Sequence, residues 1–414
     1  MIKTKAISRR KKKYNFVLIF FLLIIFGVIW FYRFQVANDR SSQETIEIRG
    51  IIWDEPSKFY SSRQFWLKGY LIETTIGQDL KAGDLVLLVG RPECQLIGKY
   101  QKRCLINYPD ISVVKGFFWS NIVKVVIGLR KNFIASLERV LPSEPASLLT
   151  GIVWGNQGQF SKRFYDDMKS SGLLHVVVAS GANVLSLVAL LEKTGRFLGR
   201  RLVIILSLPL ITGYGFIVGN DPPIVRAVLM SGLILLAQLF GRPAKGLRNL
   251  FLAGGVMTLF DPLIILDIGF QLSFGASLGI LLFGRSFKKI FHWSDLATTL
   301  AAQTLTTPIL AFHFGQLSPF SFISNALLLW LIEPLMLWGL GLTALGLISW
   351  SLAGIVGLLF WLPLQVFTWG SHFWAQILPN ITISDRLASA SLIVIPLAWL
   401  LPKLIKGKFN EQTV

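Results

Sequence analysis

Residues 172–191 read GLLHVVVASGANVLSLVALL, an apolar run that three polar side chains interrupt. At about 20 residues, such a run is long enough to cross a bilayer as a helix. Its polar residues are His175, Ser180 and Asn183. Because polar groups in hydrocarbon are costly, they normally face the interior of a helical bundle or a wet cavity. The run therefore predicts a membrane helix that lines a polar site.

The composition of the whole chain agrees with a membrane protein. Hydrophobic residues make up 53% of the 414 residues and charged residues only 15%, which is fewer charges than soluble domains carry. The formal net charge is +19. We ascribe most of it to Lys and Arg in cytoplasmic loops, and the remainder would attract a polyanion or anionic lipid.

Further apolar runs predict an α-helical bundle with about ten spans. The first run, residues 14–34, follows a basic tail, and we expect a retained first helix rather than a cleaved signal peptide. The other spans are predicted at 173–191, 202–219, 224–240, 248–260, 268–284, 296–314, 320–338, 340–360 and 385–402, with a turn near 339–341 and an interfacial segment at 361–380. The basic loops would then all be cytoplasmic, as the positive-inside rule demands. This predicts a multi-pass protein of the plasma (inner) membrane with a cytoplasmic N-terminus.

Residues 38–116 have a different pattern. Short β-rich runs at 45–53, 64–75, 84–91 and 103–114 alternate with turn signals. Four or five short strands in ~70 residues fit a small closed barrel of the oligonucleotide-binding (OB) type, with a small β-sandwich as the alternative.

Both cysteines of the chain, Cys94 and Cys104, lie in this β-rich segment. In the predicted topology the segment is extracytoplasmic, where disulfides persist. We therefore expect a disulfide across a hairpin, and two unpaired thiols are the alternative.

Between the β-rich segment and the spans we expect helices that do not cross the membrane. Residues 117–140 are apolar but interrupted by Lys and Arg, which favours a helix on the membrane surface. Residues 142–171 are predicted to be a polar helical connector. The expected domains are a tail with first helix (1–37), an extracytoplasmic OB-like β-domain (38–116), interfacial and connector helices (117–171), a multi-helix membrane domain (172–405) and a cytoplasmic tail (406–414).

Polar residues from distant spans fall at one membrane level in this topology. Arg226, Asp267 and His313 all lie near the predicted outer face, and Asp267 shares a helix face with Gln271 at i, i+4. Convergence of this kind is typical of a functional vestibule. Helix packing is the plain alternative, and Arg226 and Asp267 could simply pair, because burying either alone costs about 2.5–3.5 kcal/mol.

Four segments, in order, resemble one known family. They read LLTGIVWGNQGQFSKRFYDDMKSSGLLHVVVASGANV (148–184), PPIVRAVLM (222–230), DPLIILDIGFQLSFGASLGIL (261–281) and TPILAFHFGQLSPFSFISN (307–325). Together they are similar to the ComEC family of competence proteins, over residues 143–334. The β-rich segment also resembles the OB-like domain of that family. Asn183 stands where the family usually has a second His.

The resemblance implies a channel that passes one DNA strand into the cytoplasm during natural transformation. Its partners would be single-stranded DNA, membrane lipid, a DNA receptor outside and a helicase inside. The DNA path would include His175, Ser180, Asn183, Arg226, Asp267, Gln271, His313, Gln316 and Asn325. In this path Arg226 would guide phosphates, and Asp267 would hold Arg226 or shape its own helix.

On the β-domain, cations in a loop would track phosphates while aromatic rings stack on bases. Lys99, Lys102 and Arg103 are the candidates for the cations. We expect Trp53 and Trp66 to fill the interior of the barrel instead.

Several activities are not expected. The chain has four His residues and no HxHxDH zinc pattern, so we expect a form without the C-terminal metallo-β-lactamase-like domain of many family members. It has no GxxxxGK[ST] phosphate loop. We therefore expect no metal, no cofactor and no enzymatic activity.

Two rival functions stay open. One is a transporter of a different anionic substrate. The other is an intramembrane hydrolase using Ser180 and His175, although their i, i+5 spacing puts them ~140° apart on a straight helix.

Overall fold

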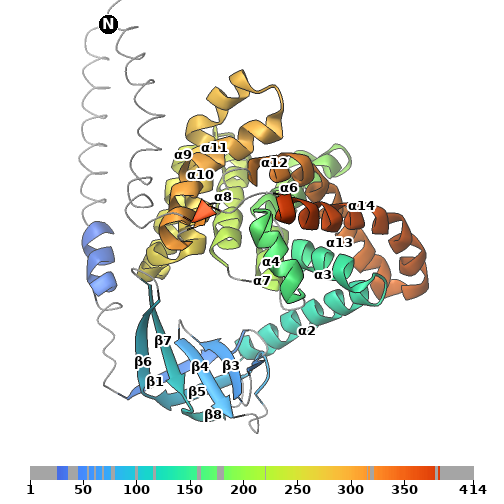
Figure 1. Cartoon of the computed structure of the whole chain (residues 1–414). Helices are drawn as coiled ribbons and strands as arrows, with labels where there is room; N and C mark the ends of the chain where they lie inside the picture. The colour runs from blue at the N-terminus through green and yellow to red at the C-terminus, as the bar shows by residue number, and fades with distance from the viewer. Residues whose placement is uncertain are drawn as a thin grey trace, which may run out of the picture.

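The computed structural model describes residues 26–35, 45–53, 56–59, 62–67, 70–75, 80–97, 101–114, 118–155, 160–174, 181–219, 221–314, 316–317, 321–377 and 381–382. A β-stranded part near the N-terminus lies beneath a larger, mostly helical part (Figure 1). Five helical units are long and apolar enough to cross a membrane: Arg200–Val218, Pro222–Leu239, Ile268–Ile290, Ser321–Ile348 and Trp350–Ile377. The protein is therefore a mostly helical multi-pass membrane protein with a small β-region. The predicted span at 385–402 lies outside the described residues.

Eight strands make up two sheets in the β-region. The first has the order β1-β5-β8, from β1 (Ile46–Ile51), β5 (Leu85–Gly90) and β8 (Asp110–Val114). The second has the order β2-β3-β4-β7-β6, from β2 (Ser57–Phe59), β3 (Ser62–Leu67), β4 (Tyr70–Thr75), β7 (Gln101–Asn107) and β6 (Pro92–Ile97). The pairs are antiparallel except β4 with β7, which is parallel.

The predicted disulfide is confirmed. Cys94 and Cys104 are bonded, and they lie directly opposite each other in the antiparallel β6–β7 pair. The bond therefore clips the two strands of one hairpin together.

Two predictions about the strands need correction. The single run at 64–75 is two strands, because Ser62–Leu67 and Tyr70–Thr75 pair with each other antiparallel. Trp66 is 49% exposed and does not fill the interior, since its neighbours Phe65 and Leu67 already face the core and side chains alternate along a strand. Trp53, 39% exposed, also lies outside the core.

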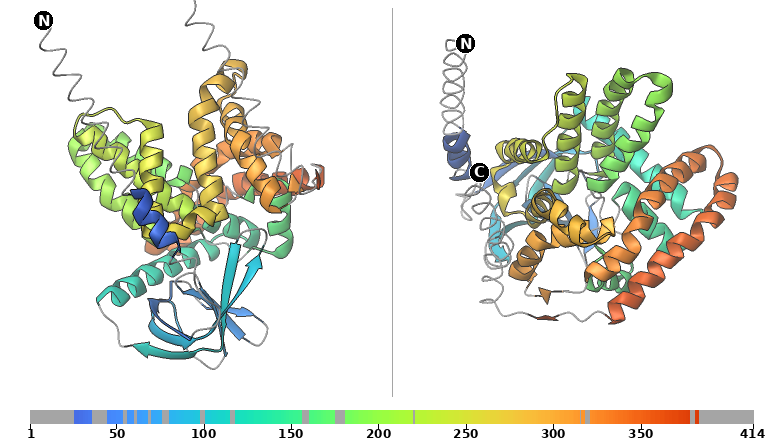
Figure 2. Two further views of the ribbon diagram at one scale, coloured as in Figure 1. Left: turned by 90° about the vertical axis from the view of Figure 1, so that its left-hand side faces the viewer. Right: turned by 90° about the horizontal axis from the view of Figure 1, so that it is seen from above.

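Helix α2 (Phe118–Glu138) follows the strands as predicted. It runs between the β-region and the helical part, crosswise to α10 (Figure 2). The connector predicted at 142–171 is not uniformly polar. Helix α3 (Ser143–Trp154) is buried at every position from Pro145 onward, whereas α4 (Lys162–Ser170) buries only Phe164 and Met168.

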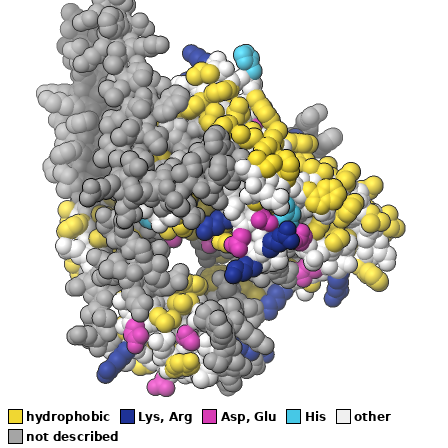
Figure 3. All heavy atoms as spheres, in the orientation of Figure 1, with side chains coloured by type: hydrophobic (Ala, Val, Ile, Leu, Met, Phe, Trp, Pro, Cys, Tyr) yellow, Lys and Arg dark blue, Asp and Glu magenta, His cyan; other side chains and the backbone are white. Residues whose placement is uncertain are grey.

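The remaining helices form the membrane part. They are α6 (Gly181–Leu198), α7 (Arg200–Val218), α8 (Pro222–Leu239), α9 (Gly246–Phe260), η1 (Pro262–Leu266), α10 (Ile268–Ile290), α11 (Ser294–Phe314), α12 (Ser321–Leu328), η2 (Leu329–Leu331), α13 (Ile332–Ile348) and α14 (Trp350–Ile377). Two short strands, β9 (Gln316–Leu317) and β10 (Ile381–Thr382), pair beside α11. Apolar side chains cover much of the helical surface in Figure 3, as expected for helices that face lipid.

The turn predicted near 339–341 is wrong. Helix α13 continues through both glycines and ends at Ile348. Helix α14 then runs unbroken to Ile377, which covers residues 361–377 of the segment predicted to be interfacial. Gly339 serves close packing instead, because a Cβ atom added there would lie 2.5 Å from Val153 Cγ2. The missing side chain lets α13 pack directly on the buried helix α3.

Candidate functional site

The ends of three other helices gather near the start of α8. A Cβ atom added to Gly181, the first residue of α6, would lie 2.9 Å from Arg226 Nη2, and one added to Gly269 of α10 would lie 3.9 Å from Pro223 Cδ. The end of α11 joins them through His313, whose Nε2 lies 2.8 Å from Gln271 Oε1. We call the polar residues here the polar cluster: Arg226, Asp267, Gln271, Ser273, Ser277 and His313. The structure thus brings Gln271 together with His313, and Arg226 together with Ser273 and Ser277. The two groups lie on opposite sides of α10, so the predicted convergence of Arg226, Asp267, Gln271 and His313 on one site is present only in part.

Arg226 is held by neutral groups. Its Nη1 donates to the carbonyl oxygen of Ser273 and to Ser277 Oγ. Its Nε and the Oγ of Ser273 are buried and have no hydrogen-bond partner among the described residues. Within the same residues no carboxylate forms an ion pair with Arg226. The positive charge of Arg226 is therefore not neutralised by any part of the chain that the structure describes.

Asp267 bonds to the backbone and not to Arg226, with which it could have formed an ion pair. Its Oδ1 accepts a hydrogen bond of 2.8 Å from the backbone N–H of Phe270, which makes Asp267 the N-cap of α10. A carboxylate at this position satisfies a backbone donor that the helix itself leaves free. Of the two roles expected for Asp267, the structure contains the one that shapes the helix.

Gln271 connects α10 to two other segments. Its Nε2 donates to the carbonyl oxygen of Ile265 at 2.9 Å, so its Oε1 is the atom that faces His313. Because Oε1 can only accept, Nε2 of His313 carries a hydrogen in this contact. The cluster therefore presents donors from Arg226 and His313 on either side of α10.

Asn183 points away from the polar cluster. It is 1% exposed and its Nδ2 donates to the carbonyl oxygen of Ile152 at 2.6 Å. The Tyr214 hydroxyl donates to the next carbonyl, that of Val153, at 2.8 Å. Both carbonyls lie in the last turn of α3, where a helix leaves its acceptors without internal partners. Asn183 and Tyr214 therefore cap α3, while Gly181, two residues before Asn183 and about 200° around α6, faces Arg226.

Of the other residues predicted for the DNA path, Asn325 lies on α12. Asn325 is 3% exposed, and its buried Oδ1 has no partner among the described residues. Gln316 lies in β9. Lys102 and Arg103, predicted to lie in a loop, belong to strand β7 instead. His175, Ser180 and Lys99 lie outside the described residues.

A cluster of three titratable side chains, apart from the polar cluster, was not predicted from the sequence. His372 Nδ1 lies 2.6 Å from Asp167 Oδ2, and its Nε2 lies 3.5 Å from Glu144 Oε2. This contact joins α14, α4 and α3. The one signal for it in the sequence is that His372 is the only titratable residue of α14, and ionisable residues in apolar helices are normally paired.

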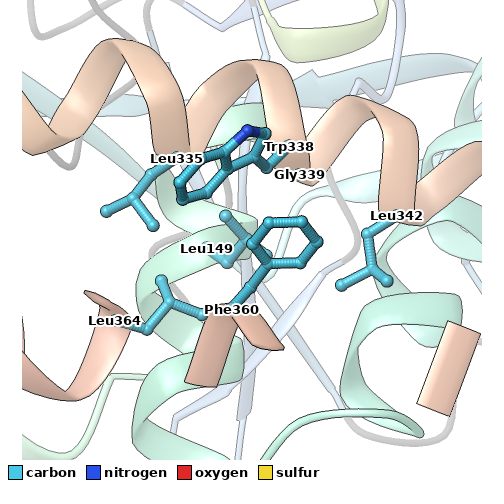
Figure 4. Close-up of a pocket in the computed structure, with 7 residues that line it drawn as sticks. All are labelled: Leu149, Leu335, Trp338, Gly339, Leu342, Phe360 and Leu364. Carbon is cyan, nitrogen blue, oxygen red and sulfur yellow. The ribbon is translucent and has the colours of Figure 1, made fainter. Parts of the chain in front are cut away.

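One pocket lies elsewhere, between α3, α13 and α14. It is lined by apolar residues and one glycine: Leu149, Leu335, Trp338, Gly339, Leu342, Phe360 and Leu364 (Figure 4). Its one polar side-chain group is the indole N–H of Trp338, so the pocket suits packing rather than the passage of a charged substrate.

Comparisons with known proteins agree on the helical part. The family described as competence protein matches residues 152–406. The chain is 28% identical over 236 residues to ComE operon protein 3 of Bacillus subtilis and 34% identical over 217 residues to an uncharacterized protein of Aquifex aeolicus. It is 25% identical over 231 residues to the uncharacterized protein YcaI of Escherichia coli.

These matches cover 55%, 51% and 51% of this chain but 30%, 50% and 30% of the respective relatives. The chain thus spans at most half the length of these relatives. No solved structure is significantly similar.

Proposed function

Because this chain belongs to the competence protein family, we propose that it passes single-stranded DNA across the plasma membrane into the cytoplasm. DNA carries a negative charge on every nucleotide and cannot enter hydrocarbon, so its route must be polar and preferably positive. The polar cluster would form part of that route, together with the predicted His175, Ser180, Gln316 and Asn325.

The observation that carries this proposal is the state of Arg226. Isolated charges in membrane helices cost about 2.5–3.5 kcal/mol and normally pair with one another. Arg226 instead bonds to neutral oxygens and keeps a buried Nε without a described partner. A DNA phosphate would neutralise the charge of Arg226 and accept a hydrogen bond from its Nε, because guanidinium groups bind phosphate in bidentate fashion.

The β-region would receive the DNA first. The chain passes from β1 to β2 and from β5 to β6, which links the two sheets at both places. The pairing of β1 with β5 and the order β6-β7-β4-β3-β2 therefore join into one closed ring of strands. Closure of this kind supports the OB-like barrel. OB barrels bind oligonucleotides on the face of their second and third strands, which here correspond to β3 and β4.

Trp66 lies on the outer side of this face and is 49% exposed, as a base-stacking residue must be. Glu73 and Glu93 share the outer face near it, where they hydrogen-bond to Gln64 and Asn107. Since these carboxylates repel phosphates, we expect the predicted cations Lys99, Lys102 and Arg103 to make the phosphate contacts of the DNA strand. A DNA receptor outside and a helicase inside would supply capture and driving force.

The test is transformation in a deletion strain complemented with this chain. Arg226→Ala should abolish uptake with normal amounts of protein in the membrane, and Arg226→Lys should retain part of it because the charge remains. Arg242→Ala, in the loop after α8, is the matched control and should leave uptake unchanged. Normal transformation with Arg226→Ala would remove Arg226 from the DNA path.

A transporter of another anion would also need Arg226, so the substrate requires its own test. Purified full-length protein should bind labelled single-stranded DNA, and the complex should weaken on Trp66→Ala. Absence of DNA binding by the intact protein would favour the rival substrate.

A further inference from the structure

Helix α2 presents three different edges along its length. One edge packs on α3, α7 and α13 and contains the buried residues Val123 and Leu137. Phe133 extends this contact, with its ring centroid 4.6 Å from that of Trp154.

The second edge is apolar and exposed. Ile122, Val125 and Leu129 are 37%, 63% and 42% exposed, and their i, i+3, i+7 spacing puts them in one line. At 100° per residue this line lies about 110° around the helix from Val123 and Leu137. We call these three residues the apolar edge.

The apolar edge continues into exposed apolar residues of another element. Ser136 lies on the same side of α2, and a Cβ atom added to Gly346 of α13 would be 3.1 Å from Ser136 Cβ. Helix α13 ends two residues later at Ile348, and α14 begins at Trp350, and both side chains are largely exposed. Tryptophan is enriched where membrane helices meet the lipid headgroups.

The third edge is cationic and faces the β-region. Lys124 and Lys131 lie about 140° around the helix from the apolar edge. Lys124 Nζ lies 2.9 Å from Asp84 Oδ1, and Gly83 (φ +91°) packs so closely that an added Cβ would be 3.1 Å from Lys124 Cα. The β-region thus sits directly on this edge of α2.

We propose that α2 lies in the membrane interface, with Ile122, Val125 and Leu129 inserted among lipids on the side of the β-region. Amphipathic helices in this position bury their apolar face about 5–10 Å into the boundary between headgroups and acyl chains. The crosswise course of α2 relative to α10 (Figure 2) suits this position. Through Lys124 and Gly83, the helix then seats the β-region against the membrane surface.

Lipid fits the apolar edge better than a protein partner does. Three side chains in one line provide far less than the roughly 800 Å² per partner of a stable protein interface. Exposed Asn121 and Asn132 border the line on one side, which limits its width. A narrow apolar line next to the exposed Trp350 fits an amphipathic helix that inserts only its apolar edge into one leaflet. The inference is independent of what the protein transports.

Fluorescence quenching in lipid vesicles tests this position. Single cysteines replace Val125, Leu129, Lys131 or Leu362 in the full chain, whose own two cysteines are bonded to each other. Each variant is labelled with an environment-sensitive fluorophore and reconstituted with lipids carrying a nitroxide at carbon 5 or carbon 12 of the acyl chain. All four positions are partly or fully exposed, so the labels leave the packing intact.

Labels at Val125→Cys and Leu129→Cys should be quenched more by the shallow nitroxide than by the deep one. The label at Lys131→Cys, on the cationic edge, should be quenched by neither. The label at Leu362→Cys, near the middle of α14, should show the reverse order and so calibrates depth. Unquenched labels at 125 and 129, equal quenching at 131, or stronger deep quenching along α2 would each overturn the proposal.

Discussion

Replacing Asn183 separates a structural role from a role in the DNA path. In the structure its amide donates to Ile152 in the last turn of α3, next to the bond from Tyr214 to Val153. Asn183→Ala leaves a buried carbonyl without its donor, and Tyr214→Phe does the same one residue later. Asn183→Asp keeps the size of the side chain, but its carboxylate oxygen, which only accepts hydrogen bonds, would face the carbonyl oxygen of Ile152, which is also an acceptor.

The size of each effect follows from burial. A buried group left unsatisfied costs about 1–3 kcal/mol, while side-chain hydrogen bonds measured in a membrane protein average only about 0.6 kcal/mol. Asn183 and Tyr214 are 1% and 6% exposed, so little water can replace the lost donor. We expect the free energy of unfolding to fall by about 1 kcal/mol for Tyr214→Phe and Asn183→Ala, and by more for Asn183→Asp.

The assay is unfolding in detergent micelles, followed by circular dichroism, together with transformation normalised to the amount of folded protein. If Asn183 caps α3, uptake per folded molecule should stay near that of the wild type in all three variants. Full stability combined with lost uptake in Asn183→Ala would refute the capping argument and return Asn183 to the path.

Three further predictions follow from particular contacts. Trp66→Ala should weaken binding of single-stranded DNA to the intact protein by about 1–3 kcal/mol, the value of one stacked base, and a fluorescence anisotropy titration measures it; unchanged affinity would exclude Trp66 from the DNA surface. Asp267→Ala should lower the stability of the protein by about 1 kcal/mol, whereas Asp267→Ser, which preserves an N-cap, should cost much less in the same unfolding assay. Gly339→Ala should destabilise by about 1–3 kcal/mol through overpacking, because the new methyl group would lie 2.5 Å from Val153; a stability gain, as expected for Ala in a free helix, would contradict the packing.

Much of the fold could be predicted from local patterns. Long apolar runs identified the helices α7, α8 and α10, because crossing hydrocarbon demands length and hydrophobicity from each helix separately. Alternating runs identified β1 and β5, and the two cysteines had only each other to bond with. These properties belong to short segments and do not depend on what packs against them.

Other features depend on neighbours that the local pattern does not contain. Gly339 suggested a turn, yet it permits a close helix contact because α3 passes beside it. Trp66 suggested a barrel core, yet Phe65 and Leu67 occupy the interior. In each case a residue type has two common uses, and only the partner from another element selects between them.

The candidate site likewise has features that the local sequence indicated and features that only contacts between elements decided. Arg226, Asp267, Gln271 and His313 are conspicuous in the sequence because desolvation makes any polar residue in an apolar segment costly, and that cost is a local property. For Asp267 the offset is also local, because it caps its own helix through Phe270, three residues on. For Arg226 it comes from α10, so only the tertiary structure decided that Arg226 meets neutral oxygens. The contact of His372 with Asp167 and Glu144 joins residues up to 228 positions apart, and no spacing rule reaches that far.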